Sequence, residues 1–304
     1  MKRRLCLNFF CFVACLMCSL SVSAAEPYVC HTTGDSTLTF YYDNLRSSRS
    51  GTTYSLNTGS NLPRWVGNGP NSYAAHVVFD PSFANARPTS TCSWFYSLQN
   101  LKSITGLNYL NTSEVTDMSF MFYYCNKLTS IDVSHFNTAK VTSMWTMFAE
   151  CSQLASLDLS SFNTSLVSDM EYLFYNCANL RTIFVSNGWT TAAVTYYDNM
   201  FTNCTSLVGG KGTTYDASHI DKAYAHIDGG PSNPGYFTEK SAFIHGDVNG
   251  NTEVTIADVS ALIDYLLTGD STGIDLAAAD CNGIDGVTIA DVSALIDYLL
   301  TGSW

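Results

Sequence analysis

Two short loops near the C-terminus have residue types and spacing suited to binding a metal ion. The first reads GDVNGNTEVTIAD from Gly246, and the second reads ADCNGIDGVTIAD from Ala279. A calcium loop turns the residues at positions 1, 3, 5, 7, 9 and 12 toward one hard cation. Counted from its first Asp, the first loop has candidate ligands at all six positions: Asp247, Asn249, Asn251, Glu253, Thr255 and Asp258. Position 7 coordinates through its backbone carbonyl, so the Glu253 side chain is not required.

The second loop follows the same spacing less completely. Its candidate ligands are Asp280, Asn282, Asp285, Gly286, Thr288 and Asp291. Ile284 stands at position 5 and has no side-chain oxygen for a cation. Two interpretations remain open for each loop: a calcium site, or a decayed loop that survives as a structural turn. We predict calcium, with the second site the weaker one.

Each loop leads into an identical segment. VTIADVSALIDYLLTG occupies 254–269 and again 287–302. In the first copy one apolar stripe at helical spacing comprises Val259, Leu262, Ile263, Leu266 and Leu267. A loop and helix, a linker, and a second loop and helix resemble a type I dockerin, which consists of paired half EF-hands. The resemblance covers 246–304.

This resemblance implies a calcium-ordered all-α domain that docks onto a cohesin-like partner module. It also implies that loop positions 10 and 11 help to choose the partner. Here those positions are Ile256–Ala257 and Ile289–Ala290. Because the two copies are identical, we expect two nearly equivalent docking faces, so that a partner could bind in either of two orientations.

A second repeat fills the middle of the chain. Four cysteines follow one another at intervals of 26, 26 and 27 residues: Cys125, Cys151, Cys177 and Cys204. The sequence between them repeats as well: each unit contains variants of L-x-x-L-x-L-x-x-F, F-N-T and M-F-x-x-C. The L-x-L part alternates like a strand, and apolar residues then recur at helical spacing. A fixed period of this length predicts stacked supersecondary units.

These motifs resemble a leucine-rich repeat, and closely the 26-residue repeat of BspA-like bacterial surface proteins. The fold class we expect is an α/β solenoid. In it, leucine-rich-repeat-like strand–helix units with a β-rich N-terminal cap precede the small all-α domain. The domains are then a cap over 26–93, repeats with a closing segment over 94–238, a linker over 239–245, and 246–304.

The repeat cysteines admit three interpretations: metal ligands, neighbouring disulfides, or small buried residues that fill a tight position. We favour burial, because equivalent positions of stacked units form a line and do not converge on one ion. Asp132, Asp158 and Phe184 also share one repeat position, which points outward from the strand. We predict that they belong to a ligand-binding face. We expect no catalytic role, since residues that recur in register offer no unique site.

The start of the chain, residues 1–25, has a basic beginning, an apolar stretch and small residues at its end. This pattern predicts a secretory signal peptide cleaved after Ala24 or Ala25. A membrane anchor, or a lipoprotein signal acylated at Cys15, is an alternative. The formal net charge of −12 argues against nucleic acid as a partner. We expect an exported protein, secreted or at the surface of a bacterium, without a transmembrane anchor.

The predicted function is non-enzymatic binding or adhesion. The repeats would present a face to a host or bacterial protein or glycan, and the calcium-binding dockerin-like module would attach the chain to a cohesin-like partner. Two alternatives stay open. The chain could be a glycan-degrading enzyme carried to a scaffold, or its C-terminal module could be only a stabilising cap. No catalytic residue is predicted, because the repeats contain no HExxH or GxSxG motif.

Overall fold

The protein is described by a computed structural model that covers residues 24–32, 34–57, 59–66, 74–240, 244–251, 253–284 and 286–304. Apart from Ala24 and Ala25, the predicted signal peptide lies outside the described residues. The buried apolar side chains form two separate clusters. One runs from Val29 to Phe237, and the other lies within the C-terminal helical region.

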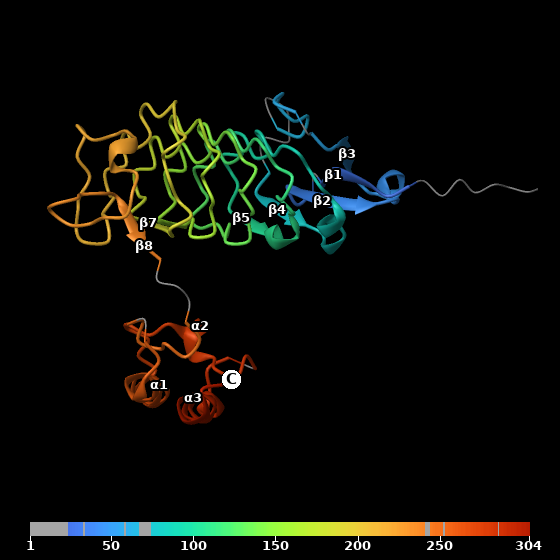
Figure 1. The fold of residues 1–304 in the computed structure, drawn as a ribbon. Coiled ribbons are helices and arrows are strands. Elements are labelled where there is room, and N and C mark those ends of the chain that lie inside the picture. The colour runs from blue at the N-terminus through green and yellow to red at the C-terminus, as the bar shows by residue number, and fades with distance from the viewer. Residues whose placement is uncertain are drawn as a thin grey trace, which may run out of the picture.

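A mixed five-stranded sheet opens the fold (Figure 1). Its strands are β1 (Glu26–Thr32), β2 (Thr37–Asp43), β3 (Thr52–Ser55), β4 (His76–Phe79) and β5 (Ser103–Thr105). The strand order is β3-β1-β2-β4-β5, antiparallel on both sides of β1 and parallel from β2 through β4 to β5. In β2 the period of two buries Leu38 and Phe40. Phe40 then packs within 6 Å of the rings of Trp65 and Trp94.

Short 3₁₀ helices supplement the strands. They are η1 (Arg46–Ser48), η3 (Pro81–Asn85), η4 (Leu107–Tyr109) and η5 (Lys222–Tyr224). A second sheet of three parallel strands contains β6 (Ser156–Asp158), β7 (Thr182–Val185) and β8 (Phe237–Glu239), in that order. The closing segment of the repeat region therefore supplies the last strand of the sheet that its repeats begin.

Between the sheets, each repeat follows a path of successive turns instead of a helix. Phe120 and Tyr124 have φ of +58° and +59°. A residue in the left-handed conformation at every fourth position prevents an α-helix, because L-residues do not continue a helix from that conformation. Successive backbone N–H groups donate alternately to a carbonyl of the same turn and to a carbonyl of the next repeat. Tyr123 N–H donates to the Phe120 carbonyl within the turn (3.1 Å), and Phe122 N–H donates to Met147 in the next repeat (2.9 Å).

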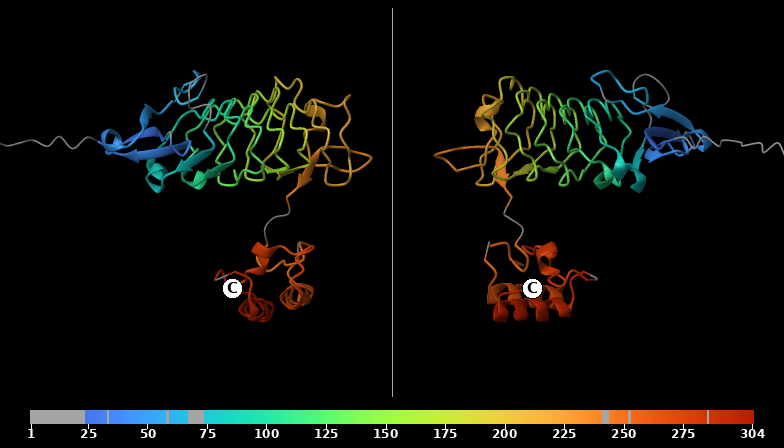
Figure 2. Two further views of the ribbon diagram at one scale, coloured as in Figure 1. Left: turned by 180° about the vertical axis from the view of Figure 1, so that it is seen from behind. Right: turned by 45° about the vertical axis from the view of Figure 1, so that its right-hand side comes forward.

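This alternation joins successive repeats in register, side by side (Figure 2). Isolated parallel bridges mark the same register, from Asp117 to Ser143 and onward to Asp169. Inside, one phenylalanine per repeat stacks on the next. The ring centroids of Phe95, Phe122, Phe148, Phe174 and Phe201 are 5.3, 5.6, 6.0 and 5.6 Å apart in turn.

The repeat cysteines are free thiols in the interior, which confirms the prediction of burial. Each Sγ donates a hydrogen bond to a phenylalanine carbonyl of the preceding repeat, at 3.0 to 3.2 Å. Cys151, for example, donates to Phe122 at 3.1 Å. Burial raises the pKa of the Cys151 and Cys204 thiols to about 12. These side chains fill space and remain protonated.

The predicted α/β solenoid of strand–helix units is wrong. The described chain has a mixed five-stranded sheet and a parallel three-stranded sheet, and none of its described repeats contains an α-helix. The stretch Val141–Cys151, whose apolar spacing predicts a helix, is a series of turns with left-handed Thr146 and Glu150. The α-helices of the described residues all lie beyond residue 255.

The C-terminal region contains α1 (Ile256–Thr268), α2 (Leu276–Ala279) and α3 (Ile289–Thr301). Helices α1 and α3 pack against each other. Val259 and Leu262 of α1 and their counterparts Val292 and Leu295 of α3 lie in the small core. Among the described residues, no helix has the length and apolar character needed to cross a bilayer.

Candidate functional site

Each C-terminal loop ends in a cap that begins the helix. Thr255 precedes α1, and its hydroxyl accepts a hydrogen bond from Ala257 N–H. Asp258 completes a capping box, because its Oδ2 accepts from Thr255 N–H at 2.8 Å and from the Thr255 hydroxyl at 3.2 Å. Thr288 and Asp291 repeat this arrangement at the start of α3, at 2.7 and 3.1 Å. Identical sequence therefore produces identical local geometry.

The other oxygen of the same carboxylate closes the loop. Asp258 Oδ1 accepts from Asn249 N–H at 3.0 Å, and Asp291 Oδ1 accepts from Asn282 N–H at 3.0 Å. Loop position 12 is thereby tied to position 3 in both copies. Asp258 and Asp291 are fully buried, and Asp247 at position 1 is 4% exposed. The predicted ligands at the two ends of the loop are therefore withdrawn from solvent together.

The donor set fits a hard cation. Asp280 Oδ1, at position 1 of the second loop, is buried without a hydrogen-bond partner in the described structure. The ion pairs found among the described residues join neither Asp258 nor Asp291 to a basic side chain. Burial raises the pKa of Asp291, but the hydrogen bonds from Thr288 and Asn282 outweigh it, and the net shift is downward. For Asp280 Oδ1, an ion would supply the partner that the described structure lacks. No trio of His, Cys, Asp or Glu suited to a metal occurs in the described ranges, so a cation would need amide, hydroxyl and backbone oxygens beside the two carboxylates of each loop.

The middle positions of the two loops differ. In the first loop, Asn251 N–H donates to Asp247 Oδ1 at 2.9 Å, and Asn251 Oδ1 accepts from Glu253 N–H. In the second, Ile284 is 62% exposed and donates its N–H to Asn282 Oδ1. Gly286 has a left-handed φ of +75°, and the candidate Asp285 lies outside the described residues.

A row of exposed apolar side chains lies along each long helix. On α1 it contains Ile256, Ile263 and Leu267, which are 71%, 38% and 79% exposed. On α3 the matching row contains Ile289, Ile296 and Leu300, which are 73%, 38% and 79% exposed. We call each set an apolar row. The predicted partner residues Ile256, Ala257, Ile289 and Ala290 are all exposed at the helix starts. Exposed apolar groups of this kind mark interaction surfaces.

The predicted ligand face of the repeats is only partly assembled. Asp158 on β6 pairs in register with Phe184 on β7. Lys240 covers both, with Nζ 3.3 Å from Asp158 Oδ2 and 5.2 Å from the Phe184 ring centroid. Burial raises the pKa of Asp158, but the hydrogen bonds from Ser160 and the charge of Lys240 outweigh it, and the net shift is downward. Asp132 is exposed in the preceding repeat.

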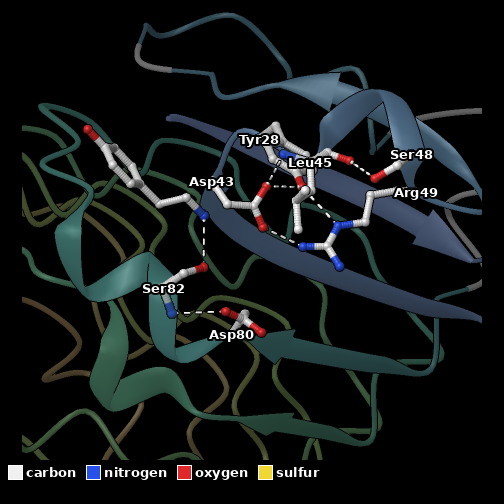
Figure 3. Close-up of polar contacts among 8 residues, drawn as sticks. Tyr28, Asp43, Leu45, Ser48, Arg49, Asp80 and Ser82 are labelled. Carbon is white, nitrogen blue, oxygen red and sulfur yellow. Dashed lines mark hydrogen bonds and ion pairs between the residues drawn. The ribbon is translucent and has the colours of Figure 1, made fainter. Parts of the chain in front are cut away.

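A polar cluster in the N-terminal sheet is a further candidate site (Figure 3). Asp43 accepts from the Tyr28 hydroxyl at 2.6 Å and pairs with the Arg49 guanidinium. Arg49 also lies 3.6 Å from the Tyr41 ring centroid and donates to the Tyr28 oxygen. Leu45 N–H caps the same carboxylate at 2.8 Å. Because these polar groups satisfy one another, the cluster ties the strand ends together and offers no reactive group.

Comparisons with known families give two matches. Residues 245–300 match the dockerin type I domain, and residues 89–223 match a family described as Mycoplasma protein of unknown function, DUF285. No curated protein and no solved structure matches the chain. Dockerin type I domains in general bind calcium and pair with cohesins. The match over the repeats is to DUF285, a domain carried by BspA-like family members, so the resemblance to leucine-rich repeats is not confirmed. The chain therefore has a C-terminal segment similar to dockerin type I domains behind a segment similar to DUF285.

Proposed function

We propose that this chain is an exported, non-enzymatic binding protein that its dockerin domain attaches to a cohesin module. The observation that supports attachment is the pair of matching apolar rows on α1 and α3. Each row starts directly after a loop whose buried carboxylates suit calcium. An ion in each loop would hold the helix starts, and with them the rows, in one fixed arrangement.

The use of the carboxylates in the repeats supports a non-enzymatic role. Asp117, Asp132 and Asp158 each accept a hydrogen bond from the N–H two residues later, at 2.9 to 3.0 Å. Such bonds stabilise turns. A glycosidase instead needs two carboxylates that flank one bond. Turnover of a polysaccharide by the full chain, abolished by removing one carboxylate, would refute this part of the proposal.

A capture experiment tests attachment. The full chain is immobilised and offered a panel of type I cohesin modules, once in calcium chloride and once in chelator. We expect at least one cohesin to be retained in calcium and released by the chelator. Retention of none, or retention that the chelator does not affect, would contradict the proposal.

The chain offers a matched control for this experiment. Leu276 on α2 is 42% exposed and lies outside both apolar rows. Replacing Leu276 by Asp introduces the same negative charge as the change at Leu267 or at Leu300 alone, but off the rows. We expect Leu276→Asp to bind like the wild type, and the double change at the rows to abolish capture.

A further inference from the structure

Exposed aromatic side chains gather on one surface of the repeat region. Ring contacts join Tyr96, Phe120, Tyr123 and Trp145 across three successive repeats. Phe120 lies 4.5 Å from Trp145 and 5.9 Å from Tyr96, and Tyr96 lies 5.0 Å from Tyr123 (centroid distances). Trp145 is 37% exposed, and the others are partly exposed. We call these four residues the aromatic strip. None of them is a buried core residue, although Tyr96 packs against the core with part of its side chain.

A polar ladder continues this surface. Tyr124, Glu150, Asn176 and Asn203 occupy one position of successive repeats, each with a left-handed backbone. Asn176 Nδ2 donates to Glu150 Oε1 at 2.6 Å, and Asn203 Nδ2 donates to Asn176 Oδ1 at 2.7 Å. We call Glu150, Asn176 and Asn203 the amide ladder. Tyr124 joins it to the strip, since its ring lies 5.9 Å from that of Tyr123.

The aromatic strip and the amide ladder lie close enough to influence the same phenol group. Burial raises the pKa of the Tyr123 phenol, and the neighbouring Tyr96, Glu150, Tyr124 and Tyr175 raise it further. Tyr123 therefore lies within electrostatic reach of both sets. The surface segments that carry the strip, Glu150 and Asn176 contain no Lys or Arg: 93–97, 119–124, 145–150 and 171–176.

We propose that the aromatic strip and the amide ladder together bind an uncharged polysaccharide chain. The negative face of an aromatic ring attracts the C–H groups on the flat side of a sugar ring. Amide and carboxylate groups supply the donors and acceptors that sugar hydroxyls require. Asn176 and Asn203 each donate one of two amide N–H groups within the ladder, and Asn176 Oδ1 also accepts there, so each amide has a second N–H donor for a sugar hydroxyl.

The spacing of the repeats supports an extended chain as the occupant. Adjacent repeats are joined by parallel backbone bridges, so they stand about 4.8 Å apart. That step is close to the length of one pyranose unit in an extended polysaccharide. Successive sugars can therefore meet equivalent positions of successive repeats.

The charge of this surface decides against two other occupants. Single-stranded nucleic acid also stacks on aromatic rings, but it needs a basic groove along its phosphates. An anionic polysaccharide would face Glu150 and Glu171 without a compensating cation in the four segments. An uncharged sugar polymer meets neither obstacle.

This inference deepens the proposed binding function and names its ligand class. The test is native gel electrophoresis of the full chain through gels containing hydroxyethylcellulose, xyloglucan or galactomannan, with polygalacturonate and oligo(dT) as charged probes. We expect at least one neutral polysaccharide to retard the protein and both charged probes to leave its mobility unchanged. Retardation by none of the three neutral polymers, or only by a charged probe, would overturn the proposal.

Variants locate the binding surface. Trp145→Ala should weaken the affinity for the polysaccharide about tenfold, by analogy with the loss of one aromatic ring that stacks on a nucleic-acid base. Asn176→Gly should weaken it as well, and it guards against a folding defect in the first variant because glycine adopts the left-handed φ of +58° at this position without strain. Leu166→Ala changes an exposed apolar side chain of the repeats (54% exposed) outside the strip and the ladder, so it is the control and should migrate like the wild type. Equal loss in Leu166→Ala and Trp145→Ala would overturn the assignment.

The two proposals fail separately. Chelator should leave polysaccharide retardation unchanged, because the strip and the ladder lie outside the dockerin loops. Cohesin capture that fails while retardation persists contradicts attachment alone. Retardation that fails while calcium-dependent capture persists contradicts the sugar surface alone.

Discussion

Identical apolar rows on two helices make a quantitative prediction about cohesin binding. Leu267 and Leu300 are each 79% exposed, and each would be largely covered by a docked partner. Complete burial of a Leu side chain contributes about 1.5 to 3 kcal/mol, so covering this fraction contributes about 2 kcal/mol, or roughly thirtyfold in Kd. An Asp at the same position would also place a charge in the interface and block that mode of docking.

The expected loss of affinity depends on whether the partner can dock on either apolar row or on one row only. If either row can take the partner, Leu267→Asp or Leu300→Asp alone removes one of two equivalent modes. Affinity should then fall about twofold, or about 0.4 kcal/mol. The double variant loses both modes and should bind at least about thirtyfold more weakly.

Isothermal titration calorimetry in calcium chloride measures these differences, using the full chain and a cohesin retained by the capture experiment. Leu276→Asp is the control and should match the wild type. If one single variant abolishes binding and the other has no effect, the partner uses one row only. The inference of equivalent faces from identical sequence and exposure would then be refuted.

Four further predictions follow from the same structure. In hydrogen-exchange mass spectrometry, calcium at a hundredfold excess over Kd should slow exchange in α1 and α3 about a hundredfold (about 2.7 kcal/mol), and unchanged exchange would contradict ion binding. The repeat thiols should not react with a thiol reagent at pH 8 in the native protein. Because the pKa of Cys151 is raised to about 12, its contribution to stability should decline as pH rises above the ordinary thiol value, which thermal unfolding at pH 8 and pH 10 would measure. Burial lowers the pKa of His135, so the unfolded chain takes up a proton at this residue at higher pH than the folded chain does, and stability should fall as pH drops below about 6.5. His135→Asn should reduce this loss of stability, measured by thermal unfolding at pH 5 and pH 7.5. An unchanged loss in the variant would show that another group causes it.

The sequence predicts the C-terminal helices well because several signals agree there. Thr255 and Thr288 are good caps, Asp258 and Asp291 complete the boxes, and Gly269 takes the left-handed φ of +72° that ends α1. The limits of the buried stripe are harder to predict. Leu267 continues the helical spacing of Val259 and Leu262, but the small core ends before it and leaves it exposed. Apolar periodicity shows which face of a helix is buried. The length of that buried face depends on the residues that pack against it.

The repeats show why apolar spacing alone predicted a helix wrongly. Two successive turns with a left-handed residue at every fourth position also place apolar residues three and four apart. Asparagine, which tolerates that conformation, occupies it at Asn176, Asn199 and Asn203, so part of the signal was in the sequence. Phe120 and Tyr172 adopt it against their usual preference, because bonds to the next repeat hold them there. The aromatic strip was missed for the same reason, since a helix would have turned those rings elsewhere.

The backbone ladder explains how this region could acquire a binding surface without losing its fold. The bonds between repeats are made by backbone groups, such as Tyr124 N–H to Ala149 and Glu150 N–H to Tyr175. The phenylalanine stack, the cysteine thiols and the buried Leu, Met, Val and Ile side chains fill the interior. The outward side chains of the turns contribute little to either, so their identities are free to vary from repeat to repeat. Tyr124 and Glu150 occupy the same position with different chemistry, and such variation is the kind that a ligand, rather than the core, selects.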